Sequence, residues 1–150
     1  MDVGVPQPLV RRRGGLIVGA GAKFRAEVEA AVASRSTVEG VQRRDFRFGG
    51  RFLWTVERAG MRNRKKVVRA CADVVLAAPC LLANRKDHPL RSNSCGGAPT
   101  RIRPVDGAVA RRCSVESGVA AAHRLHYWFK VGGTVEFASV NVHEDMSIPG

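Results

Sequence analysis

The chain has 150 residues, of which 45% are hydrophobic, and its formal net charge at pH 7 is +12. This length and apolar content predict one globular domain and exclude a chain that is disordered throughout. No apolar run is long enough to predict a membrane-spanning helix, and the excess of basic residues indicates a polyanionic partner, either nucleic acid or an anionic membrane surface.

The first 15 residues contain two prolines, three arginines and a Gly-Gly pair. This composition predicts a basic flexible arm over residues 1–15, followed by a single α+β domain over residues 16–150. The arginines of the arm also fit an organelle import signal, which is an alternative interpretation of this segment.

The next segment predicts a strand, a turn and a helix. Leu16–Val18 is a short apolar run, and the helix is expected over Ala22–Ser34. The apolar residues of that helix share one stripe: Phe24, Val28, Ala31 and Val32. Gly19 and Gly21 supply part of a dinucleotide-binding fingerprint, so a small nucleotide-binding protein is an alternative. Phe24 stands where the third small residue of that fingerprint belongs, which favours a plain turn.

Two hairpins are predicted, each around a Gly-Gly pair that can supply the positive φ of a tight turn. The first joins residues 43–48 to residues 51–57, and the second joins residues 127–131 to residues 134–137. Together they predict an α+β fold in which an antiparallel sheet carries two or three helices on one face.

Side-chain pairing favours a three-residue loop in both hairpins. That loop places Phe48 opposite Phe52 in the first hairpin and Val131 opposite Val135 in the second. The alternation of the last strand changes parity near residues 138–139, which predicts a β-bulge there.

Two more helices are expected between and after these segments, over Lys65–Ala78 and Ser114–His126. The first has an outer Arg69–Asp73 pair, and its inner face is Val67, Val68, Cys71, Val74 and Val75. Residues 84–113 have no period and contain three prolines, which predicts a long irregular connection.

The basic residues are concentrated between Arg43 and Arg69, where ten basic and two acidic side chains give a net charge of 8. Arginine outnumbers lysine 20 to 5 in the chain, and arginine both forks onto phosphate and stacks on bases. The sequence therefore predicts a non-catalytic nucleic-acid-binding protein, more specifically an RNA-binding subunit of a ribonucleoprotein particle with protein partners in that assembly. The residues expected to contact phosphate are Arg43, Arg44, Arg47, Arg51, Arg62, Arg64, Lys65 and Lys66.

Four aromatic residues share this basic tract: Phe46, Phe48, Phe52 and Trp54. An exposed ring would stack on a base, but aromatic residues in strands are more often buried, which favours a core position for all four. Two other interpretations of the tract stay open. The charge can meet an acidic protein partner, or the arginine bias can reflect GC-rich coding DNA.

The four cysteines are widely spaced and form no CxxC pair: Cys71, Cys80, Cys95 and Cys113. They predict free thiols in a reducing compartment, hence an intracellular protein of the cytoplasm or nucleus. Cys95, Cys113, His123 and His126 lack the paired short spacings of a structural zinc site. No metal, cofactor or catalytic residue is predicted.

Overall fold

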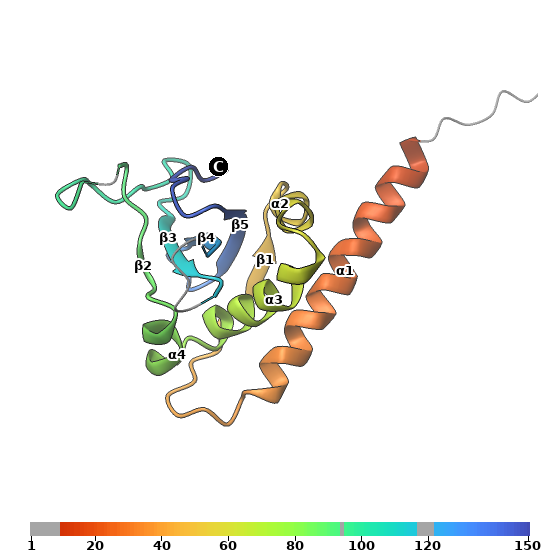
Figure 1. Cartoon of the computed structure of the whole chain (residues 1–150), viewed down its shortest axis with the longest axis horizontal. Helices are drawn as coiled ribbons and strands as arrows, with labels where there is room; N and C mark the ends of the chain where they lie inside the picture. The colour runs from red at the N-terminus through yellow and green to blue at the C-terminus, as the bar shows by residue number, and fades with distance from the viewer. Residues whose placement is uncertain (1–9, 94, 117–121) are drawn as a thin grey trace, which may run out of the picture.

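The computed structural model describes residues 10–93, 95–116 and 122–150, and within them the fold is α+β (Figure 1). The described residues form a mixed five-stranded sheet with the strand order β1-β5-β4-β3-β2, accompanied by four helices. None of the described helices is long and apolar enough to cross a membrane. The α+β class is confirmed, whereas the expected purely antiparallel sheet is wrong, because β1 pairs with β5 in parallel.

The second Gly-Gly hairpin is present as β4 (Arg124–Phe129) and β5 (Val135–Asn141), which pair antiparallel. Its loop lies one residue earlier than expected, because the Lys130 amide donates to the Thr134 carbonyl and leaves residues 131–133 in the turn. Gly133 occupies the last loop position with φ of +88°, as a three-residue hairpin loop requires. Val131 is therefore 87% exposed at the turn and is not paired with Val135.

The expected bulge near residues 138–139 is confirmed. Tyr127 lies opposite Phe137, whereas its neighbour His126 lies opposite Ser139, so Ala138 is the extra residue of β5. This bulge lets Phe137 and Val140 both face the main core.

The first Gly-Gly hairpin is wrong. Residues 46–48 form β1 (Phe46–Phe48), an edge strand whose partner is β5, and residues 52–59 form helix α2 (Phe52–Ala59). The Gly49 amide donates to the Phe137 carbonyl at 2.8 Å, and a Cβ on Gly49 would lie 3.2 Å from that oxygen. This close approach continues the β1–β5 pairing up to the turn, where the chain leaves the sheet for α2.

Helix α2 forms because a helical turn brings two apolar side chains to the same face. Phe52 and Val56 are four residues apart and both are buried. Phe52 stacks on Phe48 with ring centroids 5.2 Å apart, and it also contacts Phe24 and Phe137. The packing of these aromatic rings stabilises the helix more than the local β propensity of residues 52–59 favours a strand.

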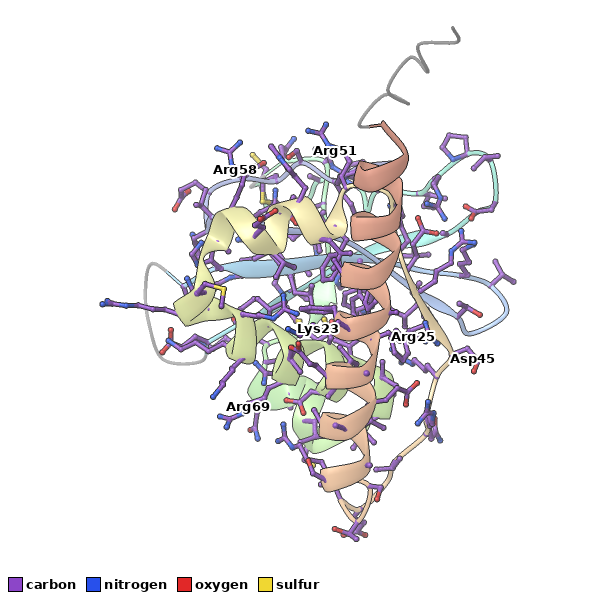
Figure 2. All side chains as sticks on the ribbon, turned by 90° about the vertical axis from the view of Figure 1, so that its right-hand side faces the viewer. Lys23, Arg25, Asp45, Arg51, Arg58 and Arg69 are labelled. Atoms are coloured by element: carbon purple, nitrogen blue, oxygen red, sulfur yellow. The ribbon has the colours of Figure 1, made fainter. Side chains whose placement is uncertain are left out.

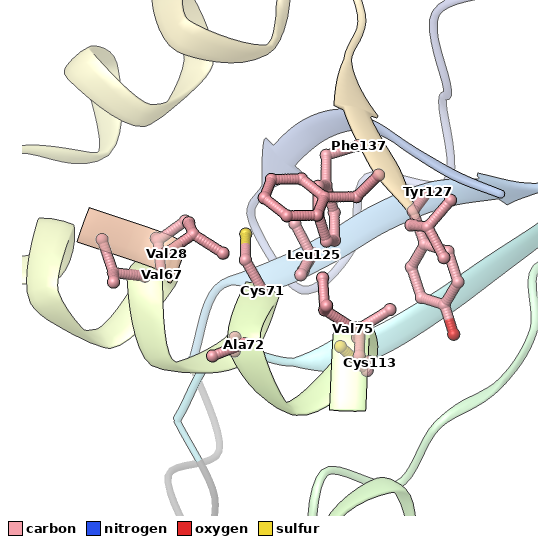
Figure 3. Close-up of a cluster of buried hydrophobic side chains, with 14 of the residues drawn as sticks. Val28, Val67, Cys71, Ala72, Val75, Cys113, Leu125, Tyr127 and Phe137 are labelled. Atoms are coloured by element: carbon pink, nitrogen blue, oxygen red, sulfur yellow. The ribbon is translucent and has the colours of Figure 1, made fainter. Parts of the chain in front are cut away.

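The main core lies between the sheet and the helical layer of α1 (Val10–Ser34), α2 and α3 (Met61–Leu76). Figure 3 shows Val67, Cys71 and Val75 of α3 beside Leu125 and Phe137 of the sheet. The expected inner face of α3 is confirmed. The helix begins before Lys65 and ends at Leu76, because Ala77 adopts φ of +53° and Pro79 begins the short helix α4 (Pro79–Asn84).

One expected surface residue of α3 is buried. Asp73 forms no pair with Arg69 but accepts from Arg85 at 2.6 Å and forms a salt bridge with Arg35. It thus links α3 to the chain on either side of the helix.

Leu16–Val18 belongs to α1, so the expected strand–turn–helix is wrong. Gly19 and Gly21 lie within the same helix and form no glycine loop, which removes the structural basis of the nucleotide-binding alternative. Of the expected basic arm, residues 1–9 lie outside the described residues, and residues 10–15 belong to α1.

The expected helix over Ser114–His126 is also wrong. Residue 114 ends strand β3 (Val109–Ser114), and residues 124–126 begin β4, with residues 117–121 of the connection outside the described part. The connection at 84–113 contains the two-residue strand β2 (His88–Pro89) and most of β3, so it is less irregular than expected.

The second face of the sheet has a small core of its own, formed by Leu90, Ala108, Ala110, Trp128 and Ala138. The C-terminal segment 142–149 covers it, with Met146 and Ile148 packed on the apolar residues. Trp128 Nε1 donates to the Pro149 carbonyl at 2.7 Å, and His126 Nδ1 donates to the Ser147 carbonyl at 2.7 Å. These two bonds fix the C-terminal segment along the sheet.

Candidate nucleic-acid interface

The structure divides the basic tract into paired and unpaired side chains. Four of the eight predicted phosphate contacts are held by glutamates from other elements. The pairs are Arg43–Glu29 at 2.8 Å, Arg47–Glu136 at 2.8 Å, Arg64–Glu27 at 2.8 Å and Lys66–Glu116 at 2.9 Å. A phosphate would have to compete with a carboxylate at each of these positions.

Arg44 is a fifth predicted contact, and it is half-buried. Its guanidinium carbon lies 4.5 Å from the centroid of the Phe129 ring. Its Nη1 is buried and has no hydrogen-bond partner among the described residues. Arg44 therefore packs on the ring of Phe129 at the end of β4 and is less exposed than Arg51, Arg62 and Lys65.

The three remaining predicted residues belong to a set of exposed cations that form no ion pair with any described residue. We call this set the unpaired cations: Arg51, Arg58, Arg62, Lys65 and Arg69. Figure 2 shows Arg51 directly before α2, Arg58 on α2 and Arg69 on α3. Arg58 and Arg69 were not among the residues predicted to contact phosphate, although both lie within the same dense basic tract.

The spacing of the unpaired cations places them on the outer faces of two consecutive helices. Arg62, Lys65 and Arg69 follow the i, i+3, i+7 pattern of one α3 face, and Val67 and Val68 on the same helix are buried. Arg58 lies in the last turn of α2 and Arg62 in the first turn of α3, with only Gly60 between the two helices. The charges therefore continue from one helix to the next.

Trp54 lies among the cations of α2 and is 48% exposed. The guanidinium carbons of Arg51 and Arg58 lie 5.1 Å and 4.7 Å from the centroid of its ring system. A core position is confirmed for Phe46 and Phe52, which are buried, and Phe48 packs against the same core. For Trp54 the core expectation is wrong, because residue 54 faces away from the helical face that carries Phe52 and Val56.

A groove of about 450 Å³ runs beside Trp54, a volume within the range of small-molecule sites, about 300–1,000 Å³. Its α2 wall includes Trp54 with Arg51 and Arg58. The opposite wall combines the end of β5, the C-terminal segment and the residue before β4, and its polar residues are His123, Ser139, Asn141, Asp145 and Ser147. The groove thus has a cationic aromatic wall and a hydrogen-bonding wall.

The hydrogen-bonding wall is internally ordered. Asn141 Nδ2 donates to Asp145 Oδ2 at 2.9 Å, and the Ser147 amide donates to Asp145 Oδ1 at 2.9 Å. Hydrogen bonds from Ser147, followed by that from Asn141, lower the pKa of Asp145 below its ordinary value. Asp145 is therefore an ionised acceptor at neutral pH.

The cysteines are separate from this groove. Cys71 and Cys113 are buried in the main core, and burial raises the pKa of both thiols. Cys80 and Cys95 are exposed, and all four are free. Over residues 10–93, 95–116 and 122–150, no three His, Cys, Asp or Glu side chains gather in a way that would hold a metal ion.

No known protein family, curated protein sequence or solved structure matches the chain. The function of this surface is therefore inferred from its own residues.

Proposed function

We propose that the protein is a non-catalytic RNA-binding protein, acting as a subunit of a ribonucleoprotein particle, and that it holds single-stranded RNA on the outer faces of α2 and α3. The observation that carries this proposal is the position of Trp54, half-exposed and flanked by Arg51 and Arg58. Non-specific binding of single strands needs a cationic track for the backbone and a ring on which a base can stack.

The ion-pair pattern supports the track. A cation that already holds a carboxylate gains little from a phosphate, because one favourable contact replaces another. The unpaired cations have no such competitor among the described residues, and their mutual repulsion is relieved when phosphates bind. Each contact also releases a counterion from the nucleic acid, which favours binding at low salt.

The fold supplies a rigid support for this surface. Four of the unpaired cations lie on α2 and α3, and Arg51 lies directly before α2. The inner faces of these two helices are anchored by Phe52, Val56, Val67 and Cys71 in the main core. Single-stranded RNA, whose bases are unstacked, is favoured over duplex because the ring of Trp54 is useful only to an accessible base.

The test compares two double variants that remove the same charge. Arg51→Gln with Arg58→Gln removes both cations beside Trp54, and Lys86→Gln with Arg91→Gln removes two exposed cations near β2, away from α2 (Figure 1). We expect the first to weaken binding of oligouridylate about tenfold or more at 0.1 M salt, and the second by less than twofold. Quenching of tryptophan fluorescence on binding reports on Trp54, because Trp128 is buried.

Equal losses in the two variants would contradict a local site and indicate a diffuse polycation. Polyglutamate is the second competitor in this assay. If it displaces RNA at matched charge concentration, an acidic protein partner replaces RNA as the favoured interpretation of the same surface.

A further inference from the structure

We infer that the groove beside Trp54 is a ribonucleotide subsite in which Asp145 receives the 2′-hydroxyl, so that the protein prefers RNA to DNA at this position. This inference rests on the proposed function and assigns a role to the wall that faces α2. One wall of the groove is cationic and aromatic, and the other carries hydrogen-bonding groups. The phosphate, the base and the sugar of a nucleotide each need a different one of these surroundings.

The charges of the two walls determine on which side of the groove a phosphate would lie. Arg51 and Arg58 line one wall and carry no ion pair within the described structure, while the ionised Asp145 lines the other. A phosphate is attracted to the arginines and repelled by the carboxylate. It therefore lies on the α2 side of the groove.

The indole ring of Trp54 determines where the base of the same nucleotide would lie. Trp54 is the only Phe, Tyr or Trp side chain that lines the groove in the described structure. It is bordered by the same two arginines, so a base stacked on it keeps its own phosphate within their reach. With base and phosphate both on the α2 side, the sugar is the part that faces the hydrogen-bonding wall.

Asp145 can take one more donor without losing its present bonds. The Ser147 amide donates to Asp145 Oδ1 and Asn141 Nδ2 donates to Asp145 Oδ2, and a hydrogen bond from the Ser147 side chain also lowers the pKa of Asp145. An ionised carboxylate has about four acceptor sites, so these three donors leave one site for a further donor. The 2′-hydroxyl is the donor that ribose has and deoxyribose lacks, and an ionised acceptor makes the stronger kind of hydrogen bond.

The experiment measures the affinity ratio of short oligouridylate to oligodeoxyuridylate, two ligands that differ only in the 2′-hydroxyl. We expect the unaltered protein to prefer the ribo form about fivefold to tenfold, as one charge-assisted hydrogen bond allows. Asp145→Asn should bring the ratio close to one. The matched control is Glu144→Gln, which removes the same charge from a side chain that is 92% exposed and lies outside the groove, and it should keep the ratio.

A second measurement needs no variant, so it holds even if Asp145→Asn does not fold. Oligouridylate with 2′-fluoro sugars retains the ribose pucker but donates no hydrogen bond, and it should bind the unaltered protein as weakly as the deoxy form. Equal affinity for the three ligands, or a preference that survives Asp145→Asn, overturns the subsite while leaving the proposed RNA surface intact. If none of the ligands binds, or if Arg51→Gln with Arg58→Gln has no effect, the proposed function itself fails.

Discussion

Two triple variants that remove equal charge from the basic tract should behave in opposite ways. The first replaces unpaired cations on the outer face of α3 by glutamine: Arg62, Lys65 and Arg69. The second replaces cations that hold glutamates: Arg43, Arg64 and Lys66. If only unpaired cations meet phosphate, RNA affinity should separate the two variants although their net charges are the same.

The magnitude follows from counterion release. Each phosphate contact on a single strand contributes about 0.7 to the slope of log K against log salt concentration, so three lost contacts lower the slope by about 2. Extrapolated from 1 M salt, this corresponds to a loss of about 100-fold in affinity at 0.1 M salt. The second variant should lose less than about tenfold, because its cations contribute only through the screened field of the whole protein.

Stability should change in the reverse order. Each exposed ion pair contributes about 0.2–1 kcal/mol to the free energy of unfolding, so the second variant should lose about 1–2 kcal/mol in total. The first should be unchanged or slightly more stable, because Arg62 lies in the first turn of α3, where a positive charge opposes the helix dipole.

Fluorescence anisotropy of labelled oligouridylate over a range of salt concentrations gives the affinities and slopes, and urea denaturation gives the stabilities. Equal affinity losses and equal slopes in the two variants would refute the division into paired and unpaired cations.

Three further outcomes follow from the same structure. Trp54→Ala should weaken RNA binding by about 1–3 kcal/mol and leave the free energy of unfolding within about 1 kcal/mol, since the ring is half-exposed; a large loss in urea stability with unchanged RNA affinity would contradict this. Gly133→Val should cost about 1–3 kcal/mol of stability because its φ is +88°, whereas Gly50→Val should be nearly silent because nothing lies within 4 Å of the added Cβ; equal thermal shifts would count against the loop geometry. Burial lowers the pKa of His126 to about 4, below its unfolded value of about 6.5, so the unfolded state binds more protons between these limits. Stability should therefore fall as the pH is lowered from about 6.5 to 4, by up to about 3 kcal/mol, and His126→Leu should flatten this part of the urea-measured profile.

The sequence predicted the two Gly-Gly segments as equals, and the structure distinguishes them through partners that are distant in the chain. The hairpin at residues 132–133 forms because the strands on either side of it pair locally. The segment at residues 46–48 instead pairs with β5, and Arg47 reaches Glu136 across 89 residues of sequence. A period-two pattern indicates a strand but carries no information about which strand it pairs with.

The buried face of α3 followed its local pattern more closely. The apolar stripe of α3 is a strong helical signal, and its five inner residues are buried as expected. The helix expected over residues 114–126 is wrong because the buried positions Val115 and Ala122, seven residues apart, fit a helical stripe although each adjoins a separate strand.

The composition of the sequence predicted where the basic tract lies, but it did not predict which of its cations form ion pairs. Whether a cation is free depends on acids contributed by other elements, such as Glu27 of α1 for Arg64 and Glu136 of β5 for Arg47. No local pattern around an arginine shows whether such a partner reaches it, so sequence reasoning grouped paired and unpaired cations together. The exposure of Trp54 escaped prediction for a related reason, since it depends on the helical geometry of α2.

Because β1 pairs with β5, the sheet and the ring cluster can be completed only after the C-terminal part of the chain has been synthesised. During synthesis the helices and their phenylalanine side chains emerge before β5 exists to pair with β1 or to contribute Phe137 to the ring cluster. The groove has the same dependence, because Trp54 comes from the middle of the chain and its opposite wall comes from residues 139–149. A nascent chain that stops short of β5 therefore carries the positive charge of the basic tract before the groove beside Trp54 exists.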